Sequence, residues 1–223
     1  MYLVLDIGNV LFNQDLTPFA KALSIQMNIS KEDAYHFINR IQKKQDLGIS
    51  NIRDEIATHF NIKSEYIIDN LIDAWNVVIT PNLTSIEFFS KLIEKNGYKI
   101  ALLSSLGFEH MNLIKKMIGD YPIYKWSTHH FSCNVGARKP SLLYYKTFLD
   151  LYPKFKGALY LDDLQENLDA GDESGLSSRL FALSKHNRIY ETEHSLQLIK
   201  EEVEAKQGML NWLESLDLDI YSR

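Results

Sequence analysis

The chain contains three short apolar runs, and each leads directly into a side chain that carries oxygen. The runs lie near residues 2–5, 100–103 and 158–161, and they end at Asp6, Ser104 and the pair Asp162 and Asp163. Apolar runs of this length are typical of strands buried on both faces, as in a parallel sheet. The carboxyl ends of parallel strands meet at the edge where open α/β sheets bind ligands. The sequence therefore predicts a parallel sheet with a polar site at one edge.

Strands and helices alternate in the second part of the chain, and this alternation indicates the fold class. We predict helices over 82–96, 108–118, 140–151 and 165–173, and strands over 98–104, 124–132, 157–162 and 178–183. Such an order is typical of an α/β protein with a doubly wound parallel sheet and helices on both faces. A last amphipathic helix is predicted over residues 192–216.

Residues 16–78 lie between the first strand and this alternating part, and they show helical spacing of apolar side chains without a convincing strand. Ser30, followed by Glu32 and Asp33, is a typical helix start, with a side-chain acceptor and early acids. Four short helices in this position predict an inserted helical cap. We expect a core of residues 1–14 and 80–223 and a cap of residues 15–79.

Composition argues against several classes of function. A formal net charge of −5 disfavours a nucleic-acid backbone as the partner. The single Cys133 cannot form an internal disulfide, which favours a reducing compartment. We see no basic leader followed by an apolar core, and no apolar run reaches the roughly 18 residues of a membrane helix. We therefore expect a cytoplasmic protein with neither a membrane nor a nucleic acid as partner.

A fourth segment, residues 136–140, supplies Lys139 after a glycine loop. The order of carboxylate, hydroxyl, lysine and paired carboxylates resembles the four motifs of the haloacid dehalogenase-like hydrolase superfamily. The local patterns Asp-x-Gly-Asn-Val, Gly-x-Arg-Lys-Pro and Asp-Asp-x-x-x-Asn also agree. They are similar to those of the bacterial branch that includes the α-glucose-1-phosphate phosphatases. The resemblance covers residues 1 to about 185 and implies a helical cap between the first two motifs.

The resemblance also implies a role for each motif. Asp6 is expected to be the nucleophile and a metal ligand, and Ser104 to bind a phosphoryl oxygen. Lys139 is expected to neutralise the nucleophile and the phosphoryl group from a loop with little core around it. Asp163 is expected to bind the metal directly, with Asp162 in support. Oxygen ligands without a cysteine or histidine cluster favour Mg²⁺ over Zn²⁺ as the cofactor.

Gly8 departs from the pattern, because most phosphatases of this superfamily have there a second aspartate that acts as general acid and base. The Gly8 carbonyl remains a possible metal ligand, but the proton donor is not identified by the sequence. The remaining candidate substrate ligands lie in the first loop, after the second strand and in the cap. We expect substrate contacts from Asn9, Ser105 and Trp75, and we consider Gln42, Lys43 and Gln45 as cap residues facing the site.

The function that follows is Mg²⁺-dependent hydrolysis of a small phosphomonoester, a sugar phosphate first and a nucleotide second, by a monomer or homodimer. Two alternatives remain open. Hydrolysis of a carbon–halogen bond uses the same aspartate nucleophile without Mg²⁺, and the pair Asp162 and Asp163 counts against it. A weakly active relative that binds phosphate or protein is slightly favoured by Gly8 and Ser105. The acidic-x-Gly-x-Ser segment at Asp46 resembles a cap turn of the same branch.

Overall fold

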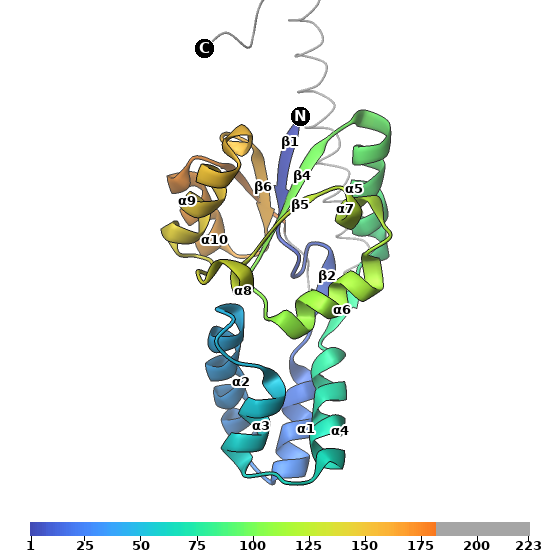
Figure 1. The fold of residues 1–223 in the computed structure, drawn as a ribbon, viewed down its shortest axis with the longest axis vertical. Helices are drawn as coiled ribbons and strands as arrows, with labels where there is room; N and C mark the ends of the chain where they lie inside the picture. The colour runs from blue at the N-terminus through green and yellow to red at the C-terminus, as the bar shows by residue number, and fades with distance from the viewer. Residues whose placement is uncertain (182–223) are drawn as a thin grey trace, which may run out of the picture.

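A computed structural model describes residues 1–181 of the chain. Its centre is a five-stranded sheet with the strand order β5-β4-β1-β6-β7, in which all neighbouring strands are parallel (Figure 1). The predicted doubly wound α/β sheet is therefore confirmed. The strands are β1 (Tyr2–Leu5), β4 (Lys99–Ser104), β5 (Thr128–Phe131), β6 (Leu159–Asp162) and β7 (Ser177–Leu180).

Both faces of the sheet are covered, because successive strand residues point to opposite sides. Leu3 and Leu5 belong to one buried cluster, whereas Val4 between them belongs to the other. Helices α5, α6 and α7 lie on one side of the sheet and α9 and α10 on the other in Figure 1. The core helices are α5 (Leu83–Asn96), α6 (Phe108–Ile118), α7 (Pro122–Lys125), α8 (Ser132–Val135), α9 (Leu142–Leu151), the 3-10 turn Pro153–Phe155, and α10 (Gln165–Ser174).

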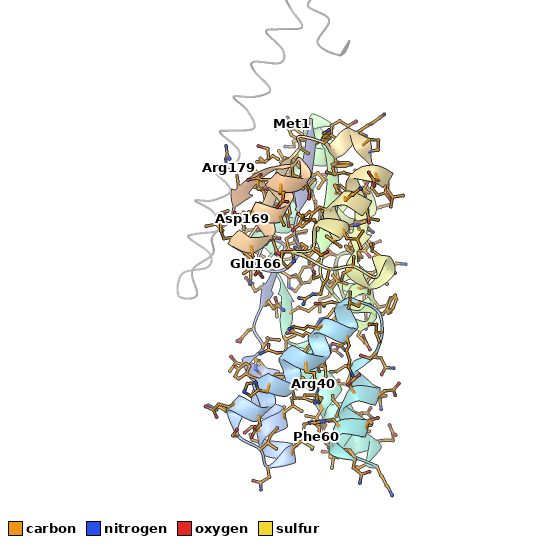
Figure 2. The ribbon with its side chains drawn as sticks, turned by 90° about the vertical axis from the view of Figure 1, so that its left-hand side faces the viewer. Met1, Arg40, Phe60, Glu166, Asp169 and Arg179 are labelled. Carbon is orange, nitrogen blue, oxygen red and sulfur yellow. The ribbon has the colours of Figure 1, made fainter. Side chains whose placement is uncertain are left out.

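Four helices form a separate bundle below the sheet in Figure 1, as the helical spacing predicted. They are α1 (Thr17–Met27), α2 (Lys31–Asp46), α3 (Ile52–Phe60) and α4 (Glu65–Asn76). Ser30 caps α2 through a hydrogen bond that its hydroxyl oxygen accepts from the Asp33 amide. In Figure 2, Arg40 and Phe60 lie in this cap, and Glu166 lies at the end of the core nearest to it.

A two-stranded ribbon joins the cap to the core, and the sequence did not predict it. Strand β2 (Phe12–Gln14) pairs antiparallel with β3 (Ile79–Pro81). Three residues are too few to show the alternation that marks a strand, and the partners lie far apart in sequence. The chain passes from the core to the cap through β2 and returns through β3. The ribbon also brings Gln14 beside Gly8.

Two predicted boundaries were wrong in the core. The strand predicted over 124–132 covers only β5, because Pro122 starts the short helix α7, a position where proline is favoured. The helix predicted from 140 begins at Leu142, because the Ser141 amide bonds the Arg138 carbonyl in a preceding turn. The predicted helix 192–216 and the end of the strand predicted over 178–183 lie outside the described residues. No helix within residues 1–181 has the length and apolar character to cross a membrane.

Candidate active site

Three neighbouring strands deliver the predicted site residues to one edge of the sheet. Strand β1 lies between β4 and β6, so Asp6, Ser104 and the pair Asp162 and Asp163 emerge side by side. The chain fills one side of β1 with β4 and β5 before it returns to β6 and β7, and a ligand crevice is expected at such a reversal. The ends of these strands point toward the cap (Figure 1). The structure therefore brings these predicted residues together.

Lys139 joins two of these carboxylates. Its Nζ atom lies 2.8 Å from Oδ1 of Asp6 and 2.6 Å from Oδ2 of Asp162. The sequence predicted a loop lysine with little core around it, but the residue is only 4% exposed. The difference arises because the loop folds inward beneath the cap, where its backbone amide donates to the Ser105 hydroxyl at 3.0 Å.

Asp162 is held from several sides and is fully buried. Its Oδ2 atom accepts hydrogen bonds from Lys139 and from the Tyr160 hydroxyl. Its Oδ1 atom accepts from the Asn167 amide at 2.8 Å and from the Leu164 backbone at 2.9 Å. With its lone pairs occupied in this way, Asp162 acts mainly to orient Lys139 and the loop after β6.

Asp163 is held by Asn9 through one of its oxygen atoms. The Asn9 side-chain amide donates to Oδ2 of Asp163 at 2.8 Å, and its own oxygen accepts from the Gln14 backbone at 3.1 Å. Asn9 has a φ of 51°, a left-handed conformation that asparagine tolerates well. Asn9 thus links Asp163 to the ribbon and also lines the cleft, and its contact with substrate stays a prediction.

Three carboxylates converge closely enough to share one cation. Oxygen atoms of Asp6, Asp162 and Asp163 all lie within 4.8 Å of one another. Like charges at this distance repel unless a cation lies between or beside them. Carboxylate oxygens are the ligands that Mg²⁺ and Ca²⁺ prefer, so the donor set fits the predicted Mg²⁺.

Burial and charge act against each other at this site. Burial raises the pKa of Asp6 to about 7, although Lys139 opposes the shift. Burial also raises the pKa of Asp163. Burial alone would lower the pKa of Lys139, but the charges of Asp6 and Asp162 outweigh it and raise that pKa. The same lysine overcomes burial at Asp162 and holds the pKa of that carboxyl below its usual value.

A cleft of about 710 Å³ lies between core and cap, and several of these residues line it. The core contributes Asp6, Ser104 and Lys139, and helix α2 contributes Tyr35, Gln42 and Asp46. A smaller cavity of about 50 Å³ continues beneath the cap, where Gly8, Gln45 and Trp75 are among the lining residues.

The cap residues proposed from the sequence therefore take different places. Gln42 and Ser105 line both cavities, and Gln45 lines the smaller one. Lys43 is exposed and lines neither. Trp75 borders only the smaller cavity, is 3% exposed, and stacks on His110 with ring centroids 4.5 Å apart.

Two further lining residues, Gln14 and Arg138, were missed as site residues. Gln14 reaches the site only through the unpredicted ribbon. Arg138 was part of the motif that contains Lys139, and it lies 3.1 Å from the Asp46 carboxylate across the boundary between core and cap. Adjacency to Lys139 was the one signal that could have identified it.

No protein-family model matches the chain, and the comparison with curated proteins gives no match. Solved structures do match. An enzyme of the haloacid dehalogenase (HAD) family from Bacteroides thetaiotaomicron, BT-2542, is 24% identical, with a TM-score of 0.68, over 85% of this chain and 97% of its own.

A mutant of the same enzyme in complex with magnesium and inorganic phosphate is 22% identical, with a TM-score of 0.68, over 81% of this chain and 93% of its own. An L-2-haloacid dehalogenase from Xanthobacter autotrophicus, with chloropropionic acid covalently bound, is 14% identical, with a TM-score of 0.54, over 82% and 78% of the two chains. The chain thus has the haloacid dehalogenase-like fold, which confirms at the level of fold the resemblance seen in its motifs.

Proposed function

We propose that this protein is a Mg²⁺-dependent hydrolase of small phosphomonoesters, acting through a phosphorylated Asp6. One observation carries the proposal. Lys139 lies between Asp6 and Asp162, and Asp163 completes a group of carboxylates within 4.8 Å at the ends of adjacent strands. An acidic nucleophile, a cation site and a fixed positive charge are what the transfer of a phosphoryl group needs.

Asp6 is oriented for attack. Its Oδ1 atom accepts from the Ile7 amide at 2.6 Å and contacts Lys139 at 2.8 Å, so Oδ2 is the oxygen that we assign to the attack. The Oδ2 atom attacks phosphorus, the bond to the leaving oxygen breaks, and an aspartyl-phosphate forms. Water then attacks the phosphorus atom and releases inorganic phosphate with free Asp6.

Ser104 and Lys139 stabilise the charge that moves during these steps. The Ser104 hydroxyl, at the end of β4, donates a hydrogen bond to a phosphoryl oxygen, and the Lys139 ammonium neutralises both the nucleophile and the phosphoryl group. Mg²⁺ would be held by Asp6, Asp163 and the Gly8 carbonyl, with Asp162 behind them. When bound, it supplies positive charge to the phosphoryl oxygens.

The substrate class is limited by the cleft. A volume of about 710 Å³ is within the range of pockets for small molecules, and α2 closes it on the cap side. We favour a sugar phosphate over a nucleotide, because polar side chains such as Gln42 and Asp46 suit hydroxyl groups. Ser105 and Trp75, which both line the smaller cavity, are the remaining proposed contacts with the small phosphorylated metabolite.

The alternative with the best support is carbon–halogen hydrolysis, because an L-2-haloacid dehalogenase shares the fold. That reaction requires a carboxylate nucleophile but no cation site. The cluster of Asp6, Asp162 and Asp163 therefore favours the phosphatase.

Turnover of p-nitrophenyl phosphate, a panel of sugar phosphates and L-2-chloropropionate, each with Mg²⁺ and with EDTA, tests the proposal. We expect phosphate release that requires Mg²⁺ and no chloride release. Asp6→Asn keeps the shape of the side chain and should lower kcat by at least about 10³-fold, or roughly 4 kcal/mol. Chloride release unaffected by EDTA would establish the alternative instead, and phosphate release by Asp6→Asn above about a hundredth of the wild-type rate would remove Asp6 as nucleophile.

A further inference from the structure

The proposed reaction leaves one group without an assigned residue, namely the acid that protonates the leaving oxygen. The question rests on the proposed function, and it arises because Gly8 has no side chain. Lack of space does not explain the glycine, since an added Cβ would meet Oε1 of Gln14 at 3.4 Å, an ordinary contact. The proton donor has therefore to be sought elsewhere in the cleft.

Acidic side chains that line the cleft within residues 1–181 fall into three groups. Asp6 and Asp163 belong to the proposed cation site. Asp15 and Glu166 are exposed at the rim. Asp46 alone is both buried, at 8% exposure, and outside the carboxylate cluster. It lines the smaller cavity as well, together with Gly8 and Ser104.

The end of α2 is fixed against the core, which places Asp46 over the site. Gly48 follows in a left-handed turn with a φ of 70°, and a Cβ there would lie 2.5 Å from the Cys133 carbonyl oxygen. Only glycine allows the turn to approach helix α8 so closely. The carboxylate of Asp46 faces Arg138 with a separation of 3.1 Å between Oδ2 and Nε.

The contact with Arg138 leaves the Asp46 carboxyl group free to donate. The Arg138 N–H does not point at the carboxylate, so the pair is electrostatic and not a formed hydrogen bond. Burial raises the pKa of Asp46 to about 6, against the opposing charges of Arg138 and Lys139. The carbonyl end of α2 also disfavours a negative charge. A carboxyl group with these properties exchanges protons near neutral pH, as a general acid requires.

The side-chain amide of Gln45, next to Asp46, indicates that an oxygen atom binds in the smaller cavity. Gln45 is 2% exposed, and its Nε2 atom is buried without a hydrogen-bond partner. It lines the smaller cavity beside Asp46 and Gly8. A buried donor without a partner is costly, so an oxygen-bearing group is expected in this cavity. The leaving oxygen, and later the attacking water, would satisfy it.

We propose that Asp46 of the cap is a catalytic residue that donates the proton to the leaving oxygen. As the bond between phosphorus and this oxygen breaks, its electron pair stays on the oxygen, which takes the Asp46 proton and departs as an alcohol. The bond from Asp6 to phosphorus forms at the same time, and Arg138 stabilises the new Asp46 carboxylate. In the second step this carboxylate takes a proton from the attacking water, and the bond from Asp6 to phosphorus breaks.

The test compares leaving groups. Asp46→Asn removes the proton and keeps the shape, and the rate of leaving-group release is measured in a single turnover, with the protein in saturating excess over the ester and with Mg²⁺. A sugar 6-phosphate needs a proton on its leaving alkoxide, so its rate should fall by about 10²–10⁴-fold. p-Nitrophenolate is stable without a proton, so its rate should fall by less than about tenfold.

Two further variants separate acid catalysis from cap docking. Arg138→Met keeps the acid but removes the charge that stabilises its carboxylate, so it should slow the sugar 6-phosphate by less than Asp46→Asn does; an equal loss in the two variants would mean that Asp46 acts through docking of the cap. Gly8→Asp added to Asp46→Asn should restore the sugar phosphate rate by at least about tenfold. Circular dichroism checks that each variant folds, and Asp46→Ser replaces Asp46→Asn if the latter does not.

Equal losses for both esters in Asp46→Asn would overturn this inference and leave the proposed function intact. A wild-type protein that hydrolyses neither ester with Mg²⁺ would overturn the proposed function and this inference with it.

Discussion

The two sides of the cleft differ in how completely their polar groups are satisfied. On the core side, Lys139, Asp162 and Asn9 bind one another or their neighbours through hydrogen bonds of 2.6–2.8 Å. On the cap side, Gln45 has a buried donor without a partner, and Asp46 forms an unaligned ion pair with Nε of Arg138, which belongs to the core. A satisfied network holds its geometry before a ligand arrives, whereas open donors and acceptors take their partners from the ligand. The core side is thus held in a fixed geometry, and the cap side is where we propose recognition and proton transfer.

The largest effect on stability is expected at Lys139. Lys139→Met leaves Asp6 and Asp162 buried without their counter-charge, which should cost about 3–5 kcal/mol of unfolding free energy. Lys44→Met is the matched cap control, because it removes an ion pair of 2.8 Å to Glu55 that is partly exposed and worth about 1 kcal/mol or less. Urea denaturation at pH 7 measures both. Equal losses would show that the core network is no more coupled than a surface pair.

The next effect concerns the boundary between core and cap. His110 of α6 is buried, its Nε2 lies 3.2 Å from the Trp75 carbonyl of the cap, and burial lowers its pKa to about 4. The unfolded chain takes up a proton as the pH falls below the ordinary value of 6.5, but the folded protein does not until about pH 4. Stability is therefore unaffected above about pH 6.5 and falls by about 3 kcal/mol as the pH approaches 4.

His110→Phe should remove this dependence, because it keeps the stack on Trp75 and cannot titrate. Other groups titrate in both proteins, so the measured quantity is the difference in unfolding free energy between wild type and variant. That difference should shift in favour of the variant between pH 7 and pH 4.5. A constant difference would mean that His110 is not held neutral by burial.

A smaller effect is expected at two glycines with nearly the same backbone conformation. Gly48 lies at the cap–core contact with φ 70°, and Gly97 ends α5 with φ 67° and no atom within 4 Å of an added Cβ. Gly97→Ala should cost about 1 kcal/mol of backbone strain. Gly48→Ala should cost about 1–2 kcal/mol more, because the methyl group meets the Cys133 carbonyl, and it should also lower turnover by displacing Asp46. Thermal unfolding and turnover rates measure both effects. Equal losses in the two variants would show that the contact of Gly48 with Cys133 does not position Asp46.

The smallest effect is expected on the cap face of the cleft. Gln42 lines both cavities, whereas the adjacent Lys43 is exposed and lines neither. Gln42→Ala should raise KM for a sugar phosphate about two- to fivefold, or roughly 0.4–1 kcal/mol, with little change in kcat. Lys43→Ala should change neither. An equal rise in KM for both variants would show that the cap acts through its charge and not through contact with substrate.

The sequence by itself determined the fold class and predicted which residues meet on the core side of the cleft. Apolar runs that end at Asp6, Ser104 and Asp162 have to bring these groups to one edge, because parallel strands share their carboxyl ends. The four cap helices were also predictable, since helical spacing and the Ser30 cap are local signals. These features depend on residues close together in the chain. The order of the four motifs added Lys139 and the expected role of each residue.

Only the tertiary structure decided how the two sides of the cleft meet. The ribbon of β2 and β3 pairs residues far apart in sequence, and through it Gln14 reaches Gly8. The burial of Lys139 depends on how its loop lies beneath the cap, which hydrophobic periodicity does not record. The position of Asp46 over the site depends on the close approach of Gly48 to Cys133, a contact between segments about 85 residues apart. Such contacts are selected by packing between distant parts of the chain, and no local pattern of residues specifies them.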